Sequence, residues 1–198
     1  MHNEVAAFIN AKVSGANATV NTPENGDASI TVDASKILEV CQALKTGEHE
    51  FNVLQAISAV DYKENLELVY VLASFSKNTE LLLKVKLPRG TNDNLPQINS
   101  VTSVWSAANW QEREAFDMMG VKFLGHPDHR RILTPDDWEG HPLRKDYVVQ
   151  EKYHDMLVNP PHKINTDDHM FMARLKETYS DPKKVTGSWK SDDAEAEA

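Results

Sequence analysis

FNVLQAISAVDYKENLELVYVLASFSKNTELLLKVKLP, residues 51–88, contains three runs rich in apolar side chains, separated by the polar breaks DYKEN and SKNTE. The runs, Phe51–Val60, Leu66–Phe75 and Leu81–Leu87, have the length and residue types of β-strands. The last run alternates, because its odd-numbered positions are all apolar whereas its even-numbered positions include two lysines. Such alternation is typical of a strand with one face in the core and the other in water. The stretch therefore predicts an antiparallel meander whose buried face packs against helices.

Two amphipathic helices are expected before the meander. Near the start of the chain, apolar residues recur at helical spacing, at Val5, Phe8, Ile9 and Val13. A second set shares one helical face, at Ile37, Leu38, Cys41 and Leu44. Ser35 is expected to cap the second helix and Gly47 to end it. Cys41, the only cysteine, is then predicted to be a core residue.

A β-hairpin is expected between the two helices. The β-prone runs Thr19–Val20 and Ser29–Val32 flank the turn-forming stretch PENGD, which has Asn25–Gly26 at its centre. An Asn-Gly pair between two such runs is a hairpin signal. After the meander, Gly90–Pro96 is expected to be a loop.

A third helix is expected from Ser106 or Asn109 to Met119, ended by Gly120. Beyond Gly120 no clean period appears through Tyr147, so an ordered but irregular segment is expected. The predicted fold class is therefore α+β, with a mainly antiparallel sheet packed with about three helices and followed by an extended irregular C-terminal segment. The expected division is an α+β core domain at residues 1–120, an extended partner-binding segment at 121–160, and a short helix with a disordered acidic tail at 161–198.

Composition narrows the class of protein. With 198 residues, 40% hydrophobic and 26% charged, the chain is expected to form one soluble globular domain, with or without an appendage. Its net charge of -9 argues against nucleic acid or a bare anionic membrane as the main partner and favours a protein. A single cysteine excludes an intrachain disulfide and a four-cysteine site for zinc or an iron-sulfur cluster. No secretory signal and no stretch of ~20 apolar residues is apparent, so any membrane association is expected to be indirect.

His126, Asp128 and His141 are the candidate ligands of a metal-dependent hydrolase, the free-standing enzyme class that the residues suggest. Their spacing is unfavourable, because helical zinc sites use two histidines four residues apart, whereas the group from His126 to His129 contains Pro127 and has no matching second pair. The favoured interpretation is that these histidines cap turns or hydrogen-bond the backbone. Neither a glycine-rich phosphate loop with its lysine nor a GxSxG nucleophile elbow is present.

The charged side chains of the third predicted helix need partners. Arg113 and Asp117 stand four residues apart and can pair. Glu112 points toward the apolar side of the helix, so it is expected to pair with an arginine. The candidate partners are Arg130, Arg131 and Arg144. Two alternatives stand at this point: a network that holds the segment onto its own domain, and a network shared with another subunit. The second is favoured, because Arg and Trp dominate interface hot spots.

A longer signature covers Asn109–Tyr147, which reads NWQEREAFDMMGVKFLGHPDHRRILTPDDWEGHPLRKDY. This run resembles the signature of the 30 kDa subunit of respiratory complex I, the bacterial NADH-quinone oxidoreductase. Upstream, AISAVDY, LELVYVLAS and LLLKVKLP resemble the strands of the same family. The likeness covers residues 51–150, with a looser fit before them.

The resemblance implies a non-catalytic structural subunit in the peripheral arm of a proton-translocating NADH:quinone oxidoreductase. Its implied partners are the neighbouring iron-sulfur subunits and the large subunit that helps form the quinone site, which we call the quinone-site subunit. FMN, iron-sulfur clusters and quinone are then expected in partner subunits, with no cofactor in this chain. The implied location is the cytoplasmic face of the bacterial inner membrane, reached only through the complex. The alternative is an equivalent subunit of an energy-converting hydrogenase or another complex I relative, because other subunits choose the electron donor.

The resemblance also implies which residues bind the partner. The positions that match the family pattern and are assigned to partner binding are Glu112, Arg113, Glu114, Asp117, His126, Asp128, Arg130, Arg131, His141, Arg144, Lys145 and Asp146. His129 departs from the pattern, because many relatives have an apolar residue there, so no family-wide contact is assigned to it. After Gln150 no role is assigned beyond that of a partner-wrapping tail.

Overall fold

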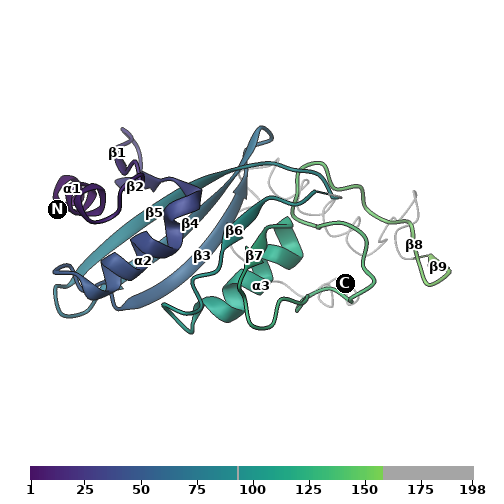
Figure 1. Ribbon diagram of the computed structural model, residues 1–198. Helices are drawn as coiled ribbons and strands as arrows, with labels where there is room; N and C mark the ends of the chain where they lie inside the picture. Colours follow the sequence, from purple (N-terminus) through teal and green to yellow (C-terminus); the bar gives the residue numbers. More distant parts are fainter. Residues whose placement is uncertain (93, 158–198) are drawn as a thin grey trace, which may run out of the picture. The chain divides into compact units, whose positions relative to one another are not determined.

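The computed structural model describes residues 1–92 and 94–157, and its larger sheet has five strands in the order β1-β2-β5-β4-β3 (Figure 1). The strands are β1 (Thr19–Asn21), β2 (Ser29–Val32), β3 (Val53–Asp61), β4 (Asn65–Ser74) and β5 (Thr79–Pro88). The predicted meander is confirmed, because β4 pairs with both β3 and β5 in antiparallel orientation. The predicted hairpin of β1 and β2 is confirmed as well. β2 also pairs with β5 in parallel orientation, a contact that the sequence did not predict.

Three α-helices lie in the described residues: α1 (His2–Lys12), α2 (Ile37–Thr46) and α3 (Ala108–Met119). Together with the sheet they confirm the predicted α+β fold class. The prediction that Ser35 caps α2 was wrong, because a 3-10 turn, η1 (Ala34–Lys36), precedes the helix. Asp33 caps this turn by accepting hydrogen bonds from the Ser35 amide at 2.9 Å and the Ser35 hydroxyl at 2.7 Å.

Two glycines end helices where the sequence predicted, for different physical reasons. Gly120 follows α3 with a φ of 69°, a left-handed conformation that favours glycine. Gly47 follows α2 with a φ of -80°, which other residues also adopt. A Cβ at Gly47 would lie 2.4 Å from the Cζ atom of Phe8 in α1 and 2.6 Å from the carbonyl oxygen of Ala43 in α2, so close packing on both sides is what requires glycine there.

The core lies between one face of the sheet and the helices. The alternation predicted along β5 is confirmed, since Leu83 and Val85 are buried whereas Lys86 is exposed. Cys41 is fully buried in α2, as predicted, and α2 lies across the sheet in Figure 1. Burial contributes about 1.5–3 kcal/mol for each large aliphatic side chain, which makes this layer the main source of stability.

Helix α3 lies beside β3, the last strand of the sheet. The side-chain amide of Gln111 donates a hydrogen bond to the carbonyl oxygen of Gln55 at 3.2 Å. Gln55 lies where the register between β3 and β4 shifts, between Leu54 and Ala56. Such an irregularity leaves Gln55 outside the ladder of β3 and β4, and its carbonyl oxygen accepts a hydrogen bond from α3 instead.

A second, two-stranded sheet was not predicted. It pairs β6 (Gln97–Asn99) and β7 (Lys122–Leu124) in parallel, one before α3 in the sequence and one after it. The Lys122 amide donates to the Pro96 carbonyl and the Ser100 amide to the Leu124 carbonyl, both at 2.8 Å. The prediction of irregular chain directly after Gly120 was therefore wrong for β7. This sheet therefore joins the segment before α3 to the segment after it.

Met1–Tyr147 forms one compact unit, and a second unit begins at Val148. The described part of the second unit contains a hairpin of β8 (Lys152–Tyr153) and β9 (Met156–Leu157). The short helix and acidic tail predicted at residues 161–198 lie outside the described residues, and the division predicted at residues 120 and 160 stays a prediction. No helix in the described ranges is long and apolar enough to cross a membrane.

Candidate functional site

The candidate residues gather where α3 meets the irregular segment of residues 125–147, which we call the strap. Asp117 of α3 is fully buried at this junction. Its Oδ2 atom accepts hydrogen bonds from the amides of Ile132, Leu133 and Thr134 at 3.0, 2.7 and 2.9 Å. Burial would raise the pKa of Asp117, but hydrogen bonds from Thr134 and Leu133 outweigh it and hold the pKa well below its usual range. An ionised carboxylate therefore anchors the strap.

Arg131 is the charged partner of Asp117. Its Nη1 atom lies 2.7 Å from Asp117 Oδ1, and its Nη2 atom donates to the carbonyl oxygens of Trp138 and Gly140, both at 3.0 Å. One guanidinium thus joins the helix to two later positions of the strap. The pairing of Asp117 with Arg113 that the helical spacing allowed does not form in the structure.

Arg113 instead holds the beginning of the strap. Its side chain is buried, its Nε atom donates to the carbonyl oxygen of Arg130 at 3.2 Å, and its Nη1 atom lies 3.4 Å from Asp128 Oδ2. The guanidinium also lies 4.9 Å from the centre of the Trp110 ring, a cation-π distance. This contact fixes an exposed indole on the outer side of α3.

Glu112 was expected to pair with an arginine, and this prediction was wrong. The carboxylate is fully buried and accepts hydrogen bonds from the Ser100 hydroxyl at 2.6 Å and the Val101 amide at 2.8 Å. Burial raises its pKa to about 7, although these two hydrogen bonds offset part of the effect. Glu112 therefore attaches α3 to the loop that precedes it and not to the strap.

The far end of the strap is fastened to the C-terminus of α3. The Nδ1 atom of His141 hydrogen-bonds the Asp117 carbonyl oxygen at 2.9 Å, and its ring packs so closely that a Cβ at Gly120 would lie 2.5 Å from Cδ2. Burial lowers the pKa of His141, and Arg131 and Arg144 lower it further, so the ring is neutral at pH 7. Arg144 donates to the Met119 carbonyl oxygen at 3.0 Å, which satisfies an orphan carbonyl of the helix end.

A separate cluster attaches the end of the strap to the large sheet. Asp61, the last residue of β3, accepts hydrogen bonds from the Lys145 amide and from Arg89, both at 2.9 Å. Arg89 also lies 3.0 Å from an oxygen of Asp146. Burial would raise the pKa of Asp61, but hydrogen bonds from the Lys145 and Lys63 amides, together with Arg89, lower it. The strap thus spans the distance from α3 to the end of β3.

The histidines of the strap contact the backbone, as the favoured interpretation predicted. His126 accepts a hydrogen bond from the Asp128 amide on Nδ1, and its Nε2 atom lies 3.0 Å from the carbonyl oxygen of Asn109. His129, to which the sequence assigned no role, accepts from the Phe123 amide at 3.0 Å. In the ranges that the structure describes, no group of three or more His, Cys, Asp or Glu side chains is arranged to hold a metal ion.

The candidate residues fall into two classes by exposure. Those buried or half-buried, with hydrogen-bond partners inside the chain, are Glu112, Arg113, Asp117, His126, Arg131, His141 and Arg144. Those exposed are Glu114, Asp128, Arg130, Lys145 and Asp146. A role in partner binding stays a prediction for all of them, but only the second class offers its charged groups to solvent.

Exposed apolar side chains on α3 and the strap were not among the candidates. Trp110, Leu133 and Leu143 are 65%, 62% and 63% exposed. Exposed aromatic and large aliphatic side chains are the residue types that anchor protein-protein interfaces. A signal was present in the sequence, because each of these residues interrupts a polar or charged stretch.

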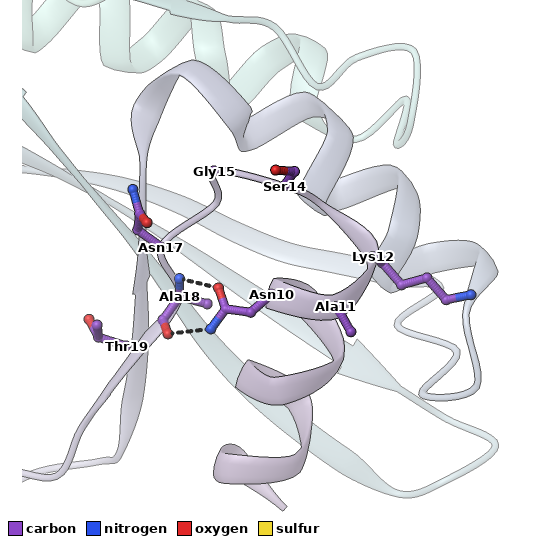
Figure 2. Close-up of a pocket in the computed structure, with 8 residues that line it drawn as sticks. All are labelled: Asn10, Ala11, Lys12, Ser14, Gly15, Asn17, Ala18 and Thr19. Atoms are coloured by element: carbon purple, nitrogen blue, oxygen red, sulfur yellow. Dashed lines mark hydrogen bonds between the residues drawn. The ribbon is translucent and has the colours of Figure 1, made fainter.

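The depression drawn in Figure 2 lies elsewhere, at the end of α1 and the start of β1. Its lining residues are Asn10, Ala11, Lys12, Ser14, Gly15, Asn17, Ala18 and Thr19. The Asn10 side chain bonds both backbone groups of Ala18, at 2.8 Å to the amide and 2.9 Å to the carbonyl oxygen (Figure 2). The polar groups of Asn10 therefore stabilise the fold, and no candidate residue lines the depression.

Comparisons with known proteins concern the family and the fold of the chain. Residues 30–153 match the family described as respiratory-chain NADH dehydrogenase, 30 Kd subunit. The NADH-quinone oxidoreductase subunit named C in Moorella thermoacetica is 48% identical over 124 residues, 62% of this chain and 80% of that protein. Its namesake in Chlorobium phaeobacteroides is 41% identical over 149 residues, 67% of this chain and 87% of that protein. A chain of the archaeal membrane-bound sulfane sulfur reductase, 23% identical, superposes with a TM-score of 0.61 over 96% of this chain and 97% of that chain.

Proposed function

The chain belongs to the family of the 30 kDa subunit of respiratory-chain NADH dehydrogenase, and we propose that it is a non-catalytic structural subunit of a proton-translocating NADH:quinone oxidoreductase. Its place is in the peripheral arm, at the cytoplasmic face of the bacterial inner membrane, which it reaches only through the complex. FMN, iron-sulfur clusters and quinone bind in partner subunits. The cysteine count supports this assignment, because the single Cys41 cannot supply the four thiolates that hold an iron-sulfur cluster.

The partner of the strap is the large quinone-site subunit, near the quinone-reducing end, with the iron-sulfur subunits beside it. The observation that carries this proposal is the exposure of Trp110, Leu133 and Leu143 on α3 and on a strap whose backbone is fixed by internal ion pairs. Preorganisation lowers the entropy cost of binding, so a rigid strap presents these side chains at little further cost. Asp128 and Arg130 add exposed charges on the same strap, and such charged residues are typical of the polar rim of an interface.

A second candidate is the same structural role in another complex I relative, such as an energy-converting hydrogenase. The superposition on a chain of the membrane-bound sulfane sulfur reductase supports it, because it shows that one fold occurs in a different respiratory complex. The electron donor is chosen by other subunits, so the composition of the complex separates the two candidates.

The experiment is affinity purification from native membranes in mild detergent, with a tag on the C-terminal end and identification of every co-purifying polypeptide. The test variant combines Trp110→Ala, Leu133→Ala and Leu143→Ala. Loss of hot-spot side chains costs about 2 kcal/mol or more, so the quinone-site subunit should be recovered at less than a tenth of the unmodified level. Phe75→Ala is the matched control, because Phe75 is 75% exposed in the turn between β4 and β5, at the end of these strands away from Asp61.

Flavin-bearing and iron-sulfur NADH dehydrogenase subunits in the eluate support the proposal, and a nickel-iron hydrogenase partner selects the second candidate. Recovery of the chain alone from the soluble fraction contradicts both. Unchanged recovery of the quinone-site subunit with the triple variant contradicts the assignment of the strap as the docking surface.

A further inference from the structure

Glu112 is a carboxyl group enclosed in an otherwise apolar core. It is 0% exposed, and the loop residue Ser100 that contacts it is 5% exposed. In the part of the chain that the structure describes, its hydrogen bonds come from one hydroxyl and one amide, and no arginine or lysine forms an ion pair with it. A buried carboxylate without a cationic partner is costly, so the carboxyl group gains from binding a proton.

A chain of hydroxyls leads from this carboxyl group toward the surface. The Oε2 atom of Glu112 lies 2.6 Å from Ser100 Oγ, which in turn lies 2.8 Å from Thr102 Oγ1. Thr102 is half-buried, whereas its neighbour Ser103 is exposed. Each hydroxyl can donate one hydrogen bond and accept another, so the three groups form a continuous path.

We propose that Glu112 is a proton-binding site that exchanges its proton with solvent through the hydroxyls of Ser100 and Thr102. On release, the Glu112 proton passes to Ser100 Oγ while the Ser100 proton passes to Thr102 Oγ1 and the Thr102 proton passes to water. Uptake runs in reverse. Each hydroxyl ends with the one proton it began with, and only the carboxyl group changes its charge.

Both protonation states of Glu112 fit the same geometry. When the carboxyl group is ionised, Ser100 donates to it. When it is protonated, it donates to Ser100, whose own proton then turns to Thr102, a pair in which either oxygen can be the donor. The Val101 amide is satisfied by Oε1 in both states. The site can therefore load and unload a proton without breaking a hydrogen bond to the backbone.

Two titratable groups face Glu112 from the neighbouring elements, and both are neutral at pH 7. Cys41 of α2 and Tyr70 of β4 are fully buried, and burial, with the Glu112 charge as a further cause, raises the pKa of each. Lys45, at the end of α2, contacts the carbonyl oxygen of Val104 in the same loop as Ser100. Burial raises the pKa of Glu112 to about 7, so among Glu112, Cys41 and Tyr70 the carboxyl group is the one that changes charge near neutral pH.

The test is carbon NMR of the full-length chain labelled at the glutamate δ-carbon, titrated from about pH 5 to about pH 9. One resonance should move with a midpoint near pH 7, and it should be missing from Glu112→Gln. Thr102→Val removes the outer hydroxyl without touching the carboxyl group. This variant should leave the titration midpoint of Glu112 in place. It should slow the exchange of the Glu112 carboxyl proton with water about tenfold, the factor for one lost hydrogen bond in the path.

Ser103→Ala is the matched control, because Ser103 is exposed on the same loop and outside the path. It should leave both the midpoint and the exchange rate unchanged. The proposal is overturned if every glutamate titrates below about pH 5, the range of ordinary glutamates. It is equally overturned if Thr102→Val exchanges as fast as the unmodified chain. Because Thr102→Val keeps the buried groups intact, the rate test stands even if Glu112→Gln does not fold.

Discussion

Replacing Asp117 by asparagine should destabilise the chain by about 3–5 kcal/mol, because it removes the charge of a buried pair and keeps the size of the side chain. Asp117 is fully buried, and its Oδ1 atom lies 2.7 Å from Arg131 Nη1. An asparagine oxygen could still accept from the strap amides, but its Nδ2 group would then face the donors of Arg131 and Thr134. The expected loss is a large part of the about 5–15 kcal/mol of a typical domain.

The assay is urea-induced unfolding of the full-length chain at pH 7, with Asp128→Asn as the matched control. Asp128 is an exposed carboxylate that lies 3.0 Å from the Nε atom of exposed Arg130 and 3.4 Å from the Nη1 atom of buried Arg113. Arg113 keeps its hydrogen bond to the Arg130 carbonyl oxygen when Asp128 is replaced, so the replacement should cost about 1 kcal/mol, well below the cost at Asp117. Equal unfolding midpoints for Asp117→Asn and Asp128→Asn would refute the reasoning. It would mean that the strap is held by something other than this carboxylate.

The pH dependence provides a second readout of Asp117. Its native pKa lies below the ordinary value of 3.8, so the unfolded chain binds a proton more tightly than the native chain. The stability contributed by Asp117 is therefore fully present above about pH 4 and is lost as the pH falls toward the native pKa. Asp117→Asn should lack this part of the acid sensitivity.

Three further predictions concern single positions. With Glu112 present, the free energy of unfolding should fall by about 3 kcal/mol as the pH rises from about 4.5 to about 7, because the native pKa of about 7 lies above the ordinary 4.5. Glu112→Gln should remove this fall from the urea unfolding curves. Equal slopes of unfolding free energy against pH with and without Glu112 would contradict the prediction. Gly120→Ala should cost about 1–3 kcal/mol and speed proteolysis of the strap, because φ is 69° and the new Cβ would meet His141; unchanged cleavage would show that the ring moves aside freely. Asn10→Ala should lower the free energy of unfolding in urea by about 1 kcal/mol, because the two hydrogen bonds to Ala18 are lost. Asn10→Gln should be destabilised as well, because its longer side chain cannot keep both bonds; full stability of Asn10→Gln would contradict this.

The strands and helices of the core could be predicted because their periodicity extends over many residues. The alternation from Leu81 to Leu87 and the helical spacing of Ile37, Cys41 and Leu44 are local patterns, and the structure confirms both. β6 and β7 could not be found this way, because each has three residues and a period of two needs more.

The choice of partners at the candidate site could not be predicted from spacing. Helical geometry allows Arg113 to reach Asp117, but the strap brings Arg131 and three amides to the same carboxylate and outcompetes a single exposed pair. The partners of Glu112 come from a loop before α3, at Ser100 and Val101, and no local pattern indicates that a hydroxyl replaces an arginine there. Such pairings depend on contacts between segments that are remote in sequence.

The side chain of Asn10 bonds both the amide and the carbonyl of Ala18, the residue directly before β1, as a neighbouring strand would do. On the opposite side of the sheet, α3 lies along β3. In the described part of the chain, each border strand of the sheet therefore has a neighbour from the same chain, Asn10 beside the start of β1 and α3 beside β3. A subunit that is not yet assembled can polymerise with copies of itself through unpaired edge strands, and contacts at these edges from its own chain make such pairing less favourable. Assembly must then proceed through side chains, which can distinguish one partner from another where a bare backbone cannot.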